Sequence, residues 1–304
     1  MTTRCGFAAV IGAPNAGKST LVNALVGSKV AIVTPKVQTT RMNVRGVALR
    51  GETQIVLVDT PGIFKPRRRL DRAMVAAAWS GAADADAVVL LVDAADFAAD
   101  PQGHGARDSE AIVEGLKAAD RKAALALNKI DAMKHADLLP LVEKLNASVF
   151  ERVFMISALK GDGLNALGDW CASKMPEGPW LYPADQSADI PSRLLAAEIT
   201  REKIYLRLHD ELPYASAVET EKWEERKDGS VKIDQTIYVQ RDSQKAIVLG
   251  KGGASIKAIG ELARKEMEHI FARRVHLFLF VKVREDWADK REHYREIGLE
   301  YPEE

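Results

Sequence analysis

The segment GAPNAGKS at Gly12–Ser19 places two glycines, a lysine and a serine where they could bind phosphate. It fits the pattern G-x-x-x-x-G-K-[ST], and it lies between an apolar run of strand length and a helical stretch. Gly12 and Gly17 let the backbone curl so that several N–H groups point at one anion, and the helix adds the positive end of its dipole. Lys18 would reach the terminal phosphates of a nucleotide, and the Ser19 hydroxyl would hold Mg²⁺. The competing interpretation is a glycine turn that only caps a buried helix.

A second motif, DTPG at Asp59–Gly62, follows the apolar run Ile55–Val58. A carboxylate at Asp59 can hold Mg²⁺ through a water, and the N–H of Gly62 can meet a terminal phosphate. Taken alone, these four residues are also compatible with a structural turn. The interval from Ser19 to Asp59 favours the nucleotide site.

NKID at Asn128–Asp131 and SALKG at Ser157–Gly161 each follow a further apolar run. Guanine presents two adjacent donors, its ring N–H and its exocyclic amine, and a fixed carboxylate such as Asp131 accepts from both. Adenine lacks this pair of donors, so the carboxylate discriminates between the two bases. A single N-K-x-D tetrapeptide is a weak signal, but its order with the other motifs predicts a guanine nucleotide.

The elements that must position these motifs alternate between strands and helices through the first half of the chain. Strand-length apolar runs, expected to be buried on both faces of a sheet, are Phe7–Ile11, Ile55–Val58, Ala87–Val92, Ala123–Leu127 and Val153–Ile156. Helix-length segments between them include Ser19–Val26, Leu70–Gly81 and Ser109–Ala119. This alternation predicts an α/β domain with a mostly parallel sheet. Val44–Leu49 is joined to the next strand only by RGET, which predicts one antiparallel strand at the sheet edge.

A proline-rich stretch at 176–190, without a helix or strand period, is predicted to be a linker. It would separate a first domain at 1–175 from a second at 191–304. The second domain reads α–β–β–α–α–β, a small α+β arrangement. Its glycine-rich segment GKGG, at Gly250–Gly253, lies between two helical stretches.

The overall composition favours a cytoplasmic protein that contains two domains. Its 304 residues include 43 basic and 43 acidic side chains, so the formal net charge is zero. The two cysteines cannot form a disulfide framework, which favours a reducing compartment. The N-terminus lacks a signal-peptide pattern, and the apolar runs are too short to span a bilayer. We expect a monomer.

The four motifs, in this order and on these strands, resemble those of the Ras-like, translation-factor class of GTPases. The resemblance implies GTP binding and hydrolysis with Mg²⁺ as cofactor. The segment QTTR at Gln38–Arg41 would be the first switch, with Thr40 as the second hydroxyl on Mg²⁺ and Thr39 as the alternative. The implied nucleotide-binding residues are Asn15, Ala16, Gly17, Lys18, Ser19, Thr20, Asp59, Gly62, Asn128, Lys129, Asp131, Ser157, Ala158 and Leu159.

The same resemblance assigns roles within this set. Asn128 and Asp131 would recognise guanine, Lys129 would lie along the base, and the N–H of Ala158 would meet the guanine oxygen. The implied metal ligands are Ser19, Thr40 and Asp59. The implied catalytic residues are Lys18, Thr40, Gly62 and Asn15.

Ile63 occupies the position where the Ras-like pattern carries a water-orienting glutamine. An alkyl side chain makes no hydrogen bond, so we expect slow intrinsic hydrolysis. Asn15 resembles the asparagine with which related GTPases help to hold K⁺ beside the β- and γ-phosphates, and potassium-stimulated hydrolysis is therefore a hypothesis. The alternative is that Asn15 serves only the loop conformation, because asparagine tolerates unusual backbone angles.

The GKGG segment matches the GXXG loop of a KH domain, which clamps single-stranded RNA. The order of elements around it is similar to the type II KH arrangement. Between 241 and 284 there are 10 basic and 4 acidic residues, a local charge of +6 that suits a nucleic-acid backbone. The predicted RNA-binding residues are Gly250, Lys251, Gly252, Gly253 and Lys257.

Other side chains of the second domain were assigned from periodicity. In the helix after GKGG, the apolar residues recur at helical spacing and are expected in the core. Lys257, Arg264 and Lys265 lie off that stripe, and contact with RNA and simple solvation both stay open for them. In the last strand, alternate residues from Val275 to Val283 are expected to form one buried face. Phe278 and Phe280 lie on the other face, where we expect a helix to cover them; the alternative is that they stack on bases.

Together the two domains resemble the bacterial Era family of GTPases, over essentially the whole chain. Supporting segments include TPKVQTTR in the first switch and DSQKAIVLGKGGASIKAIG around the GXXG loop. The resemblance implies binding to the 3′ end of small-subunit rRNA, a switch role in maturation of the small ribosomal subunit, and peripheral attachment to the inner membrane. Two alternatives stay open: a GTPase of tRNA modification or membrane transport, and an RNA-binding scaffold whose nucleotide is only structural.

Overall fold

The computed structural model describes residues 2–134, 137–145, 148–209, 212–285, 287 and 290–302. The chain divides into two compact units. The first unit consists of Met1–Ala31, Thr40–Asp189 and Gly298–Glu304. The second consists of Ile32–Thr39 and Ile190–Ile297. The predicted domain ranges follow chain order. In the structure, the second unit also includes Ile32–Thr39, and the first also includes Gly298–Glu304.

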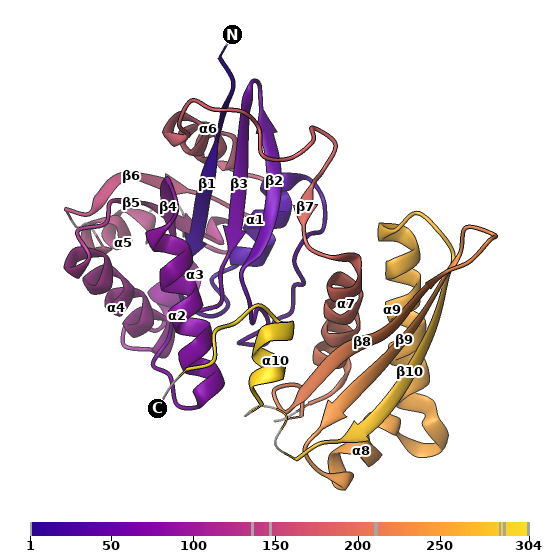
Figure 1. The fold of residues 1–304 in the computed structure, drawn as a ribbon. Coiled ribbons are helices and arrows are strands. Elements are labelled where there is room, and N and C mark those ends of the chain that lie inside the picture. The colour runs from indigo at the N-terminus through magenta and orange to yellow at the C-terminus, as the bar shows by residue number, and fades with distance from the viewer. Residues whose placement is uncertain are drawn as a thin grey trace. The chain divides into compact units, whose positions relative to one another are not determined.

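The first unit is built on a seven-stranded sheet with the order β6-β5-β4-β1-β3-β2-β7 (Figure 1). Its strands are β1 (Arg4–Ile11), β2 (Val44–Arg50), β3 (Thr53–Asp59), β4 (Ala87–Asp93), β5 (Ala123–Asn128), β6 (Phe150–Met155) and β7 (Ala188–Asp189). Strands β1, β3, β4, β5 and β6 pair in parallel, while β2 runs antiparallel to β3. The mostly parallel sheet predicted from the alternating pattern is confirmed.

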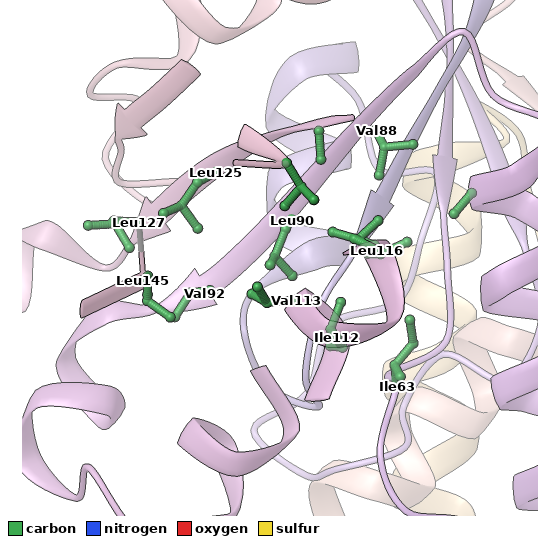
Figure 2. Packing of buried hydrophobic residues seen from close by; sticks show 14 of the residues in the cluster. Ile63, Val88, Leu90, Val92, Ile112, Val113, Leu116, Leu125, Leu127 and Leu145 are labelled. Carbon is green, nitrogen blue, oxygen red and sulfur yellow. The ribbon is translucent and has the colours of Figure 1, made fainter. Parts of the chain in front are cut away.

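Helices cover both faces of this sheet. The helices of this unit are α1 (Lys18–Val26), α2 (Arg69–Ala83), α3 (Ala94–Ala99), α4 (His104–Ala118), α5 (Leu138–Leu145), α6 (Leu164–Lys174) and the 3₁₀ turn η1 (Ile130–Ala132). Apolar residues of α1 and α6 share one core cluster with the sheet, and those of α2, α3, α4 and α5 share the other. Figure 2 shows part of the second cluster, which includes Leu90 and Val92 of β4 and Ile112 and Leu116 of α4.

Strand β1 lies at the point where the connections reverse direction. The chain leaves β1 through α1 toward β2 and β3 on one side, and then crosses through α2 to β4 on the other side. In open α/β sheets, ligands bind at the carboxyl ends of the strands beside such a reversal. The loop after β1 is the phosphate-loop segment, so the topology places it at the expected site.

Two expectations for the edges of this sheet were wrong. Strand β2 is not at the edge, because β7 pairs with it through Arg45 and Asp189 and through Gly46 and Ala188. The two residues of β7 lie in the stretch predicted as a linker. Strand β6 is not buried on both faces, since it is the outermost strand and Val153 is 37% exposed.

The second unit has a three-stranded sheet with the order β10-β9-β8. Strands β8 (Ser216–Glu225) and β9 (Val231–Val239) form an antiparallel hairpin, and β10 (Val275–Val283) pairs with β9 in parallel. Its helices are α7 (Ser192–Arg207), α8 (Asp242–Leu249), the 3₁₀ turn η3 (Lys251–Gly253), α9 (Ala254–Ile270) and α10 (Arg291–Glu296). The parallel pairing of β10 and β9 is the arrangement expected for a type II KH domain.

Helices α7, α8 and α9 bury their apolar residues against one face of this sheet. Ile259, Ala263 and Met267 of α9 are fully buried, which confirms the apolar stripe as core. The expectation for Phe278 and Phe280 was wrong, because these side chains are 46% and 52% exposed. All three helices pack on the opposite face, with Leu277, Leu279 and Val281 beneath them.

Candidate nucleotide and RNA sites

The phosphate loop joins β1 to α1 and contains two glycines at places that admit no larger residue. At Gly17 the backbone is left-handed, with φ of 98°, and a Cβ atom would lie 2.4 Å from Nδ2 of Asn128. At Gly12 a Cβ atom would lie 2.3 Å from the carbonyl oxygen of Leu91. The loop therefore needs glycine at both positions to sit against β4 and β5.

Lys18 opens α1, and its side chain is buried along the loop. Its Nζ donates to the carbonyl oxygens of Gly12 at 3.2 Å and of Ala13 at 2.9 Å. Burial lowers the pKa of Lys18 to about 8, although the charge of Asp59 opposes the shift. A phosphate group would offer this ammonium the counter-charge that two carbonyls supply only in part.

Three oxygen-bearing side chains converge beside Lys18. Ser19 Oγ lies 2.6 Å from Oδ2 of Asp59 and 2.9 Å from Oγ1 of Thr40, and it donates to the carboxylate. Asp59 is fully buried, and its Oδ1 has no hydrogen-bond partner among the described residues. Burial raises the pKa of Asp59 to about 6, although hydrogen bonds from Ser19 and Thr40 and the charge of Lys18 lower it in part. Two hydroxyls and an incompletely bonded carboxylate are hard oxygen ligands, so this set fits Mg²⁺.

The positions of the Thr39 and Thr40 hydroxyls bear on which of the two could be the second hydroxyl ligand of Mg²⁺. Thr39 Oγ1 lies 2.6 Å from Oγ1 of Thr34 and donates to the carbonyl of Lys36 at 2.8 Å. Its hydroxyl is thus used within its own loop. Thr40 instead faces Ser19 and Asp59, as the family resemblance implied.

The predicted base site is held together by Asn128 at the end of β5. Its Nδ2 donates to the carbonyl of Ala16 at 2.8 Å, and its Oδ1 accepts from the N–H of Ala158 at 2.9 Å. Asn128 therefore ties the phosphate loop to the SALKG loop. This bond also uses the Ala158 N–H to which the resemblance gave a role with guanine.

The other predicted base-site residues lie around Asn128. Asp131 accepts a hydrogen bond from Ser157 Oγ at 2.6 Å, which orients the carboxylate. Lys129, with φ of 65°, pairs with Asp93 at the end of β4. Sequence reasoning missed Asp93, although its place directly after the apolar run AVVLLV was a usable signal. Leu159, within the SALKG loop, is 76% exposed.

The second switch begins where DTPG leaves β3. Gly62 packs tightly on Pro14, because a Cβ atom there would lie 2.9 Å from the proline ring. The N–H of Ile63 donates to the carbonyl of Gly12 at 3.1 Å. The Ile63 side chain is buried in the apolar cluster of Figure 2, so it takes no part in aligning water. Thr20 lies in the first turn of α1.

Asn15 adopts a left-handed backbone conformation with φ of 62°. Asparagine tolerates this conformation better than most residues, so the loop alone gives a reason for its presence. The geometry is compatible with both of the roles considered for Asn15.

The GXXG loop lies between α8 and α9 in the second unit. Gly250, Gly252 and Gly253 all have positive φ values, of 71°, 59° and 78°. At Gly252 and Gly253 no atom lies within 4 Å of where a Cβ would be, so a ligand backbone can approach closely. Lys251 is exposed on this loop. Gly252 and Gly253 thus form the open part of a turn at the start of a long helix.

Basic side chains near the loop fall into two groups. Lys257 is exposed one turn into α9. Arg264 and Lys265 instead pair along the helix with Glu268 and Glu261, at 2.9 Å and 2.8 Å. These pairs favour the interpretation of Arg264 and Lys265 as a solvated face.

Comparison with protein families finds both a GTPase domain and a KH domain in this chain. A model described as "50S ribosome-binding GTPase" matches residues 7–129, and a KH domain model matches residues 211–288. GTPase Era of Rhizobium meliloti is 62% identical over 302 residues, covering 99% of this chain and 94% of the relative. GTPase Era of Caulobacter vibrioides is 61% identical over 307 residues, covering 98% and 97%.

Solved structures give the same result. A variant of Aquifex aeolicus Era bound to GDP·AlF₄⁻ is 37% identical, with a TM-score of 0.89 over 97% of this chain and 99% of the other. Era in complex with MgGDPNP and nucleotides 1506–1542 of 16S rRNA gives the same identity, TM-score and coverage. With such identity to relatives over nearly the full length of both chains, the chain belongs to the Era family of GTPases.

Proposed function

We propose that this GTPase binds single-stranded rRNA at its GXXG loop and uses its nucleotide as a switch. The reaction of the family is hydrolysis of GTP to GDP and phosphate. The observation that carries the RNA proposal is the likeness to an Era structure that contains both MgGDPNP and 16S rRNA nucleotides. The open glycine turn with exposed Lys251 and Lys257 supplies matching chemistry in this chain. We further propose the 3′ end of small-subunit rRNA as the target, and maturation of that subunit as the process.

In the nucleotide site, Ser19 and Thr40 would hold Mg²⁺ directly and Asp59 would hold it directly or through water. Lys18 would leave its two carbonyl partners for the terminal phosphates. When bound, the metal neutralises charge that develops on the phosphates. Asp131, oriented by Ser157, would accept from the two guanine donors, while Asn128 would keep the phosphate and base loops in register.

The RNA proposal is tested with one loop variant and a matched control. Gly252→Asp adds a carboxylate to the GXXG loop, and Gly229→Asp adds the same group to the β8–β9 turn. Both glycines have positive φ and open surroundings, so the backbone cost is similar. We expect Gly252→Asp to weaken binding of a labelled small-subunit 3′-end RNA at least about tenfold, because the carboxylate repels phosphates. Gly229→Asp should stay within about twofold.

The outcomes separate this function from its rivals. Equal loss in both variants, or no loss in either, would reject RNA binding at the loop. Binding of transfer RNA in preference to the rRNA fragment would favour a tRNA-modification GTPase. A wild-type protein that binds RNA but turns over no GTP in a single-turnover assay would favour the scaffold with a structural nucleotide.

Potassium stimulation remains part of the proposal through Asn15 in the phosphate loop. We expect single-turnover hydrolysis to run faster in potassium chloride than in sodium chloride at equal ionic strength. Equal rates would reject a potassium site. Asn15→Gly keeps the tolerance of positive φ but removes the side-chain oxygen, and it therefore separates a ligand role from a conformational one.

Among the described residues, no helix has both the length and the apolar composition needed to cross a bilayer. Peripheral contact with the inner membrane stays a prediction from the family resemblance, and a cytoplasmic location and a monomeric state stay predictions from the sequence. Co-sedimentation with vesicles of anionic phospholipid tests the membrane contact.

A further inference from the structure

The segment Ile32–Thr39, which contains the first part of the switch, belongs to the second compact unit. Thr40 belongs to the first unit, where its hydroxyl faces Ser19. The chain therefore passes from one unit to the other at the peptide bond between Thr39 and Thr40. A planar peptide allows few relative positions of neighbouring residues, so a group that fixes Thr39 also restricts the Thr40 hydroxyl.

Helix α7 holds this segment by its main chain. Nη2 of Arg201 donates to the carbonyl oxygen of Thr39 at 2.6 Å. Oε1 of Glu202 accepts from the N–H of Val33 at 2.9 Å. The two bonds fasten both ends of the segment, and they do not depend on the side chains that the segment carries.

Two further hydrogen bonds join the segment to α7 and to the residue that follows it. The hydroxyl of Tyr205 lies 3.4 Å from the carbonyl oxygen of Gln38. Nζ of Lys36 donates to the carbonyl of Leu208, which follows the end of α7. The segment is thus attached along its length to one helix of the RNA-binding unit.

Arg201 is rigidly placed for this task. Its side chain is 3% exposed, and its Nε donates to Oε1 of Glu198 at 2.7 Å. The guanidinium carbon lies 5.3 Å from the ring centre of Tyr205. Its Nη1 has no hydrogen-bond partner among the described residues, so a buried N–H is available to a further acceptor. Leaving a buried charged N–H without an acceptor costs free energy, so a rearrangement that supplies an acceptor is favoured.

We propose that Arg201 is a positioning residue for Thr40, and that it sets how readily the Thr40 hydroxyl reaches Mg²⁺ beside a γ-phosphate. The proposal rests on the proposed nucleotide function and names its regulation. Switch segments of GTPases are ordered by contacts to Mg²⁺ and the γ-phosphate and are released after hydrolysis. Arg201 should therefore matter for a bound triphosphate and much less for GDP.

Helix α7, which contacts the segment Ile32–Thr39, also contacts the RNA-binding elements. Lys203 pairs with Glu266 of α9, the helix that follows the GXXG loop. Thr200 Oγ1 lies 2.6 Å from Oε1 of Gln235 in β9. If the triphosphate shifts the free energy of the α7 contacts, linkage requires RNA binding through these elements to shift nucleotide affinity in return.

The test compares nucleotide affinities in full-length protein. Arg201→Gln is combined with Glu198→Gln, so that no buried carboxylate is left unpaired. We expect the affinity for MgGDPNP to fall about tenfold and the affinity for MgGDP to change less than about twofold. Arg207→Gln, an exposed site in the last turn of α7, is the matched control and should change neither affinity.

A double-mutant cycle with Thr40→Ala shows whether Arg201 acts through Thr40. In the Thr40→Ala background, the paired substitution should change MgGDPNP affinity less than about twofold, because the group it positions is gone. An equal loss of affinity for MgGDPNP and MgGDP would overturn the role of Arg201. The same tenfold loss of MgGDPNP affinity in the Thr40→Ala background would also overturn it. Failure of the wild-type protein to bind MgGDPNP would instead reject the nucleotide function itself.

A measurement on wild-type protein covers the case in which the variants fail to fold. Hydrogen exchange is followed at residues 32–40 and along α7, with MgGDP and then with MgGDPNP. We expect the protection of both segments to change together when the nucleotide changes. A change at residues 32–40 with none in α7, or no change in either, would overturn the proposal.

Discussion

Asp59 and Lys18 are buried side by side at the phosphate loop, and burial moves their pKa values toward each other. The pKa of Asp59 rises to about 6 and that of Lys18 falls to about 8. Both shifts arise because burial removes water from a charged group whose opposite charges nearby compensate only in part. A divalent cation for Asp59 and a phosphate for Lys18 would supply those partners together.

These two pKa values predict the pH dependence of nucleotide binding. Below about pH 6 the carboxyl of Asp59 is protonated in the free protein, and Mg²⁺ must displace that proton. Above about pH 8 Lys18 is neutral, and phosphate binding must restore its proton. The affinity for MgGTP should therefore be greatest between these values and fall by up to about tenfold per pH unit on either side.

Calorimetry in buffers of different ionisation enthalpy checks both proton movements. Proton release should accompany binding on the acid side, and proton uptake on the basic side. Asp59→Asn should flatten only the acid limb of the profile. A wild-type affinity that is constant from about pH 5 to about pH 9 contradicts the assignment.

Ile63 predicts that a Ras-like glutamine cannot simply be restored. The side chain is 6% exposed within an apolar cluster, so Ile63→Gln buries an amide there. We expect the free energy of unfolding to fall by about 1–3 kcal/mol and the rate of GTP hydrolysis to stay unchanged. Denaturant unfolding and single-turnover hydrolysis measure the two effects, with Ile63→Val as the apolar control. Faster hydrolysis in Ile63→Gln would show that the side chain faces the nucleotide.

At the scale of whole elements, the sheet of the second unit has one covered and one open face. Phe280 of β10 is 52% exposed on the open face. Ile259 of α9 is fully buried between its helix and the covered face. Phe280→Ser should change the free energy of unfolding by less than about 0.5 kcal/mol. Ile259→Ala should cost about 2–5 kcal/mol, because it leaves a cavity between helix and sheet. Equal costs in denaturant unfolding would show that helices cover both faces.

Local signals predicted the elements that carry the nucleotide site. The phosphate loop, DTPG and NKID each lie where a strand ends, and the parallel sheet brings those ends together. Strand β7 escaped prediction, since two residues carry no period and their pairing depends on distant β2. Phe278 and Phe280 were misplaced because large apolar side chains stand on both faces of β10, so the presence of such side chains alone does not say which face the helices cover.

Within the candidate site, the sequence also predicted residue types better than residue partners. Asp59, Ser19 and Thr40 do meet, because each is fixed by a motif. Asn128 was expected at the base, yet its amide bonds join two loops. Such a bond depends on three segments meeting in space, and no single motif contains that information.

At the scale of the whole molecule, chain order and compact units differ at the first switch. The segment Ile32–Thr39 lies in the unit that carries the GXXG loop, while Thr40 lies in the unit that carries the phosphate loop. A nucleotide switch needs an element whose position both sites influence. The chain around Thr39 and Thr40 meets this requirement by its connectivity alone.

The central claim is that one chain binds a guanine nucleotide and single-stranded rRNA, and that the two events are coupled. Its most direct test is calorimetric titration of the small-subunit 3′-end RNA into wild-type protein saturated with MgGDPNP or with MgGDP. We predict binding in both states, tighter with MgGDPNP by a factor in the range of about 5 to 150. Equal affinities in the two states, or no heat of RNA binding in either, would contradict the claim.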